Sequence, residues 1–130
     1  MALLEIPSPG IPLEYGAQGD PLVILVHDWY GRLPALEADG RALAHDGFHV
    51  LIPDLYNGWA TTDETDAAGL LRNLDLTVSV NAIGSLARGG RAAGAPRVGL
   101  VGFSMGGWLA LEQAQAGSVD AVVAYYATLN

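Results

Sequence analysis

A five-residue segment, GFSMG at residues 102–106, has the residue types and spacing of a nucleophilic serine site. Ser104 lies between an apolar stretch and a helix-forming one, so the pattern G-x-S-x-G predicts a sharp turn from a strand into a helix. Such a turn strains the backbone of the serine, and a side chain at Gly102 or Gly106 would collide there. We therefore predict that Ser104 is a nucleophile. A glycine-rich turn that only lets a helix pack closely, or that holds a phosphate, is the alternative.

Negative charge that develops on an attacked carbonyl oxygen is stabilised by N–H donors. The helix that follows Ser104 offers the N–H of Met105 at its positive end. In hydrolases with this kind of turn, a second N–H comes from the loop after an earlier strand. Residues 27–31, HDWYG, follow the apolar run of residues 22–26 and fit that loop. We predict an oxyanion hole formed by the backbone N–H groups of Trp29 and Met105.

Hydrophobic periodicity predicts the elements that position these residues. Short apolar runs indicate strands at residues 22–26, 48–52, 97–103 and 119–126, after a Pro- and Gly-rich start that suits short edge strands. Helices are predicted at residues 34–46 and 105–116, and a stripe of Leu71, Leu74, Val78, Ala82 and Leu86 predicts one longer helix between them. Strands that alternate with helices predict an α/β fold, a mostly parallel sheet with helices on both faces.

The amino-acid composition argues against several classes of function. The chain of 130 residues has 14 acidic residues and six basic ones, all arginine, for a net charge of −8. This balance argues against nucleic acid or an anionic membrane as a partner. The chain has no cysteine, so it has no thiolate metal site, and we expect no metal and no cofactor. The N-terminus lacks the pattern of a signal peptide, so we expect a cytoplasmic protein.

Four blocks of sequence together resemble the dienelactone hydrolase family: residues 27–31, 47–56, 102–107 and 119–126. They occur in the family's order and spacing, and the similarity covers nearly the whole chain. The resemblance implies an α/β-hydrolase fold and a hydrolase that acts on a small-molecule ester or lactone. Because the family's domain is longer, it also implies that residues 1–130 are the N-terminal part of a single α/β-hydrolase domain, without its C-terminal strands.

Two positions depart from the family's pattern. The founding dienelactone hydrolases have Cys at the position of Ser104 and Glu at the position of Asp28. By analogy with that Glu, Asp28 is a candidate catalytic residue that contacts the Ser104 hydroxyl, and a plain loop cap is the alternative. The family's block that ends at Tyr56 is often followed by an arginine that holds a substrate carboxylate. Asn57 stands there instead, which leaves recognition of an acidic lactone unsupported.

A serine nucleophile needs an adjacent base, and in this fold the acid and the histidine follow the nucleophile. No histidine follows Ser104. Of the three that precede it, we expect His27 to be structural, with a base as the alternative, His45 to be solvated and His49 to pack in a strand. The catalytic Asp and His are therefore expected from a remaining C-terminal half, as a separate chain or a continuation of this one. The alternative is a non-catalytic α/β-hydrolase-like module for binding or regulation.

Overall fold

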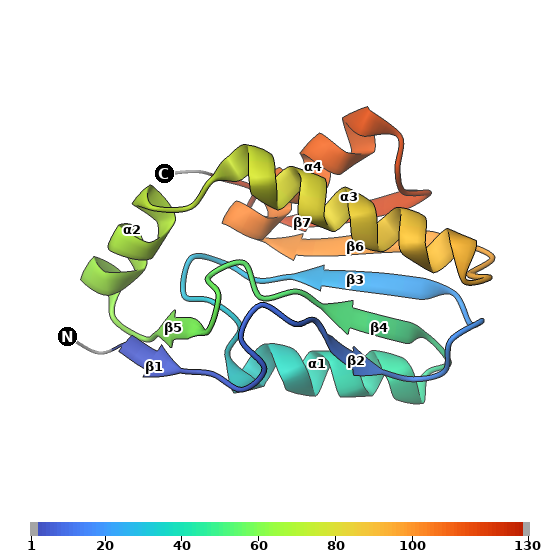
Figure 1. Ribbon diagram of the computed structural model, residues 1–130, viewed down its shortest axis with the longest axis horizontal. Coiled ribbons are helices and arrows are strands. Elements are labelled where there is room, and N and C mark those ends of the chain that lie inside the picture. The colour runs from blue at the N-terminus through green and yellow to red at the C-terminus, as the bar shows by residue number, and fades with distance from the viewer. Residues whose placement is uncertain (1–2, 129–130) are drawn as a thin grey trace.

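A five-stranded sheet forms the centre of the structure, a computed structural model that describes residues 3–128 (Figure 1). Its strand order is β2-β4-β3-β6-β7, and every pairing is parallel except that of β2 with β4. Strands β1 and β5 form a separate antiparallel pair. In chain order the elements are β1 (Leu3–Glu5), β2 (Leu13–Tyr15), β3 (Leu22–Val26), α1 (Pro34–His45), β4 (His49–Ile52), β5 (Trp59–Thr61), α2 (Glu64–Arg72), α3 (Leu76–Ala92), β6 (Val98–Phe103), α4 (Met105–Ala116) and β7 (Ala121–Tyr125).

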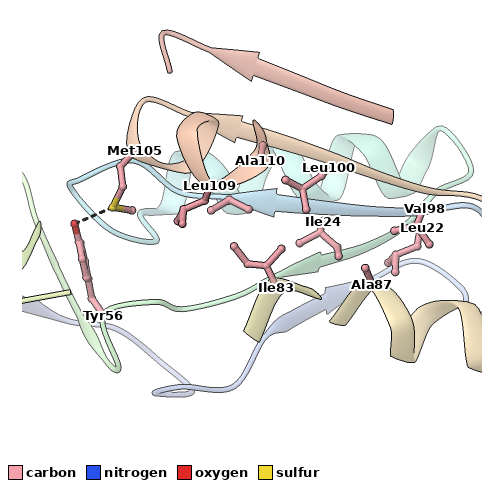
Figure 2. Packing of buried hydrophobic residues seen from close by; sticks show 11 residues of the cluster. Leu22, Ile24, Tyr56, Ile83, Ala87, Val98, Leu100, Met105, Leu109 and Ala110 are labelled. Atoms are coloured by element: carbon pink, nitrogen blue, oxygen red, sulfur yellow. Dashed lines mark hydrogen bonds between the residues drawn. The ribbon is translucent and has the colours of Figure 1, made fainter. Parts of the chain in front are cut away.

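Helices cover the two faces of the sheet, as predicted. Helices α3 and α4 pack on one face and α1 on the other (Figure 1). Figure 2 shows Ile24 and Leu100 of the sheet gathered with Ile83 of α3 and Leu109 of α4 in the larger of two buried apolar clusters. The smaller cluster, on the α1 side, contains Val23, Leu25, Leu36, Val50 and Ile52. Strand β3 is buried along its whole length because both of its faces are covered.

The register brings three strand ends together at one edge of the sheet. Val26, the last residue of β3, lies opposite Gly102 of β6. Phe103, the last residue of β6, lies opposite Tyr125 of β7. Because these strands are parallel, the segments that follow each of them start side by side. Ligands of open α/β sheets bind at this carboxyl edge.

The α1 side of β7 is largely uncovered. Val123 is 46% exposed and Tyr125 is 47% exposed, and the Tyr125 ring stacks on the Phe103 ring with centroids 5.1 Å apart. Strand β7 is also the edge strand of the sheet, paired only with β6 within residues 3–128. The sheet therefore ends in an apolar strand whose outer hydrogen-bonding groups face away from β6.

One predicted helix is wrong, because the apolar stripe of residues 71–86 belongs to two helices. Helix α2 ends at Arg72, and α3 begins after Asp75, whose side chain accepts a hydrogen bond of 3.0 Å from the N–H of Val78. This N-cap starts a new helix while the spacing of leucines continues across the break. Strand β5, between β4 and α2, was not predicted. The other predicted strands and helices are confirmed to within two residues at each end. No helix within residues 3–128 is long and apolar enough to span a membrane.

Candidate active site

The turn between β6 and α4 holds Ser104 in a strained backbone conformation. Its φ of 56° and ψ of −114° lie outside the regions that residues with a side chain favour. The N–H of Ser104 donates to the carbonyl oxygen of Tyr125 at 2.7 Å, and its carbonyl oxygen accepts from the N–H of Thr128 at 3.2 Å. The end of β7 and the segment that follows it thus fix both sides of the residue. No hydrogen bond of the Ser104 hydroxyl is found within residues 3–128.

Two glycines make this turn possible, as the sequence predicts. A Cβ on Gly102 would lie 2.1 Å from the carbonyl oxygen of Gly106. A Cβ on Gly106 would lie 2.4 Å from the carbonyl oxygen of Val26 and 2.5 Å from that of His27. All of these neighbours are backbone atoms, which cannot rotate away. The first turn of α4 therefore packs directly on the end of β3, and the loop after β3 lies beside the start of α4.

Both predicted oxyanion donors are backbone N–H groups without a partner in residues 3–128. Met105 is the first residue of α4, where an N–H has no intrahelical acceptor. Trp29 lies in the loop after β3, and the N–H groups of the two residues after it are both engaged. That of Tyr30 donates to the Asp28 carboxylate at 2.9 Å, and that of Gly31 donates to the Asp28 carbonyl oxygen at 3.2 Å.

The Asp28 carboxylate is placed where a loop cap would be. It accepts the hydrogen bond from Tyr30, two residues on, which closes an Asx turn. Within residues 3–128 no hydrogen bond joins Asp28 to Ser104. A contact between the Asp28 carboxylate and the Ser104 hydroxyl stays a prediction. Asp28 does border the cavity beside the turn, described below.

His27 is a buried, doubly bonded side chain rather than a free base. Its Nε2 accepts a hydrogen bond of 3.0 Å from the N–H of Leu55, and its Nδ1 lies 2.7 Å from the carbonyl oxygen of Asp28. Burial lowers the pKa of His27, opposed by its hydrogen bond to Asp28 and by the charge of Asp54. The ring is therefore neutral at pH 7.

The other two histidines lie away from the turn at Ser104. His49 Nε2 pairs with the Glu14 carboxylate at 2.5 Å, so it bonds as well as packs in its strand. His45 is exposed at the end of α1, as predicted. No histidine in the described chain hydrogen-bonds Ser104. The base that a serine nucleophile needs is thus not found among residues 3–128.

A buried arginine and an aspartate hold the segments around the site. Arg32 is 1% exposed, and its guanidinium donates to four carbonyl oxygens at 2.7–3.4 Å, those of Pro7, Ser8, Ile11 and Ile52. The Asp54 carboxylate accepts from three backbone N–H groups at 2.6–3.1 Å, of Gly10, Tyr56 and Gly58. The Asp54 carboxylate therefore caps the loop after β4. The sequence analysis missed Arg32, since nothing in its sequence neighbours indicates a buried guanidinium.

Tyr56 joins the loop after β4 to the start of α4. It is 7% exposed, and its hydroxyl donates to the Met105 sulfur at 3.7 Å (Figure 2). Burial raises the pKa of Tyr56. Tyr56 and Trp59 are the aromatic residues that lie nearest to each other in this part of the sequence, and they differ in burial. In the structure Tyr56 belongs to the buried cluster, while Trp59 lies in β5 and is 39% exposed.

A cavity of about 190 Å³ lies beside the turn, between the loop after β3 and the first half of α1. Apolar side chains line it, including Leu33, Leu36 and Phe103, and Phe103 directly precedes Ser104. Asp28 and Asp39 are its carboxylates, and no arginine lines it. Within residues 3–128 no group of three His, Cys, Asp or Glu side chains is arranged to hold a metal ion. The cavity therefore suits an apolar group without a negative charge.

The strand order, the helices on both faces and the turn at Ser104 are those of an α/β-hydrolase fold. The sequence profile described as "Dienelactone hydrolase family" matches residues 13–130, and the chain belongs to this family. The resemblance of the four sequence blocks is thereby confirmed.

Three known proteins that are similar to this chain are each longer than it. Carboxymethylenebutenolidase 1 of Cupriavidus pinatubonensis (strain JMP 134 / LMG 1197) is 29% identical over 117 residues, which cover 82% of this chain and 50% of that protein. A candidate dienelactone hydrolase from Klebsiella pneumoniae subsp. pneumoniae MGH 78578 matches with a TM-score of 0.74 and 24% identity, over 98% of this chain and 61% of that one. P91, a dienelactone hydrolase-like promiscuous phosphotriesterase from metagenomic libraries, matches with a TM-score of 0.62 and 17% identity, over 94% and 58%. The chain spans about half the length of the curated relative.

Proposed function

We propose that the protein is a serine hydrolase of carboxylic esters or lactones, which acts on a small molecule in the cytoplasm. Ser104 Oγ attacks the carbonyl carbon, and its proton passes to a base. The alcohol group leaves with a proton, and water then releases the acid from the acyl-serine. During both steps the N–H groups of Trp29 and Met105 stabilise the oxyanion.

The observation that carries this proposal is the backbone of Ser104. A φ of 56° at a residue with a side chain costs free energy, and the structure maintains it with two glycines that cannot be anything larger. A turn that only allowed close packing could use glycine at position 104 as well. The presence of serine at the strained position, followed directly by a helix N-terminus, supports a nucleophile.

The charges around the cavity support a neutral substrate. The two carboxylates that border the cavity, of Asp28 and Asp39, would repel a carboxylate group on a substrate. The guanidinium of Arg32, in the loop after β3, is occupied by four backbone carbonyl oxygens. We therefore infer an ester or lactone whose acyl part is apolar and uncharged.

We propose that the catalytic Asp and His come from a C-terminal half, either a separate chain or a continuation of this one. Two observations support this. Both ring nitrogens of His27, and one ring nitrogen of His49, are hydrogen-bonded to other residues. In addition, this chain covers 50% of its curated relative. The uncovered side of β7 is a surface on which such a half could pack.

Covalent labelling with a fluorophosphonate tests the proposed nucleophile. We expect mass spectrometry to find the label on Ser104. Labelling should be slow in the 130-residue chain, because no histidine of residues 3–128 bonds Ser104, and faster once the C-terminal half is present. Ser104→Ala should abolish labelling. Ser8→Ala is the matched control, because Ser8 is an exposed serine that also has a φ of 56°. Labelling at another serine would contradict the assignment.

The rival function is a non-catalytic module for binding or regulation. It is supported by the absence of a histidine bonded to Ser104 within residues 3–128. If Ser104 remains unlabelled when the C-terminal half is present, while the fold is intact by circular dichroism, the protein is a non-catalytic module and the proposed hydrolase function is wrong.

A further inference from the structure

The loop after β3 holds one peptide group in a fixed orientation, the one that joins Asp28 to Trp29. Its carbonyl oxygen lies 2.7 Å from Nδ1 of His27 and accepts a hydrogen bond of 3.2 Å from the N–H of Gly31. Because the peptide is trans, the N–H of Trp29 points away from both of these groups. That N–H is the unpaired donor described above.

The contacts of His27 define its tautomer. The N–H of Leu55 donates to Nε2, so Nε2 presents a lone pair. The proton of the neutral ring therefore lies on Nδ1, which donates to the Asp28 carbonyl oxygen. The ring is 1% exposed, so water does not compete for either bond.

We propose that His27 is a positioning residue, which directs the Trp29 N–H toward the oxyanion by holding the carbonyl group of Asp28. This inference rests on the proposed function, because it assigns a task to the oxyanion hole. The ring does two separate things. Its Nδ1 orients the peptide, and its Nε2 ties the loop after β3 to the loop after β4 at Leu55.

Two substitutions separate these tasks. In His27→Asn the side-chain amide nitrogen can occupy the place of Nδ1 and keep the bond to Asp28, but nothing reaches Leu55. In His27→Gln the longer side chain can place its oxygen where Nε2 was and keep the bond from Leu55, but the donor to Asp28 is lost. If His27 has only a structural role, the rate of Ser104 labelling should fall in parallel with the thermal stability in both variants.

The expected results differ between the variants. In His27→Gln we expect Ser104 to be labelled at least about tenfold more slowly, short of the hundredfold or more that loss of a donor costs. In His27→Asn we expect labelling within about threefold of wild type, together with the larger loss of thermal stability from the unpaired Leu55 N–H. The exposed His45→Gln serves as a control that changes neither quantity.

NMR spectra test the geometry without any reaction. Long-range ¹H–¹⁵N spectra of the imidazole should show the Nδ1–H tautomer, and the Trp29 amide peak should shift in His27→Gln far more than in His27→Asn. An Nε2–H tautomer, or labelling rates that follow the melting temperatures of the two variants, would overturn the proposal. If wild-type Ser104 takes no label, the proposed function fails, and the tautomer and the Trp29 peak still decide the role of His27.

Discussion

Gly106, in the first turn of α4, lies directly against Val26 at the end of β3, so that a Cβ would stand 2.4 Å from the Val26 carbonyl oxygen. We expect Gly106→Ala to lower the free energy of unfolding by an amount near the upper end of the range of about 1–3 kcal/mol, because a backbone carbonyl group cannot move aside. Urea denaturation measures the loss. Gly89→Ala is the control, since this glycine of α3 has open space around it. This substitution should raise the free energy of unfolding by about 0.4–1 kcal/mol. Equal effects of the two substitutions would contradict the close contact.

Stability should depend on pH through His27. Burial places its folded pKa below the ordinary value of 6.5, so below pH 6.5 the unfolded chain binds a proton that the folded chain does not. The contribution of the neutral His27 ring to the free energy of unfolding is fully present above pH 6.5. It falls by up to about 1.4 kcal/mol per pH unit as the pH decreases toward the folded pKa. Urea denaturation at about pH 7.5 and about pH 5.5 compares wild type with His27→Gln, which should lose less stability on acidification. A pH effect of the same size in both proteins would show that His27 is not the cause.

Removal of the Arg32 guanidinium should destabilise the fold strongly. Arg32→Met leaves four carbonyl oxygens without this donor, in a place that water does not reach, and we expect the free energy of unfolding to fall by at least about 3 kcal/mol. The control is Arg72→Met, at an exposed position in the last turn of α2, which should change stability by less than about 0.5 kcal/mol. Thermal denaturation measures both. A small effect at Arg32 would mean that water can enter and replace the guanidinium.

Asp28→Asn separates the two roles considered for this carboxylate. Asn keeps an oxygen that can accept from the Tyr30 N–H, so the Asx turn and the melting temperature should change little. If Asp28 contacts the Ser104 hydroxyl, loss of the charge should change the pH profile of Ser104 labelling. An unchanged profile, with Asp28→Ala less stable by about 1 kcal/mol, would leave only the loop cap.

The 130-residue chain on its own should associate through β7. Its apolar edge strand has Val123 46% exposed and carries no charge to discourage pairing with another strand. We expect light scattering to show a mass that rises with protein concentration. Val123→Lys should reduce the association, and Leu111→Lys, also exposed but on α4, should not. A monomer at every concentration would contradict this prediction.

The local signals in the sequence predict most of this fold, because each belongs to one element. The apolar run of residues 22–26 is a strand buried on both faces, and the glycines around Ser104 allow only one kind of turn. The break before Asp75 was missed because the spacing of apolar residues continues through it. Contacts between distant residues leave no such signal. The bonds of Arg32 to residues 7–11, and those of His27 to Leu55, depend on how loops meet in space.

The backbone at Ser104 is held by hydrogen bonds to the backbone of Tyr125, Trp108 and Thr128, and within residues 3–128 its side chain makes none. The scaffold is therefore indifferent to whether a hydroxyl or a thiol is attached there. Exchange of serine for cysteine at this position should therefore leave the turn itself in place.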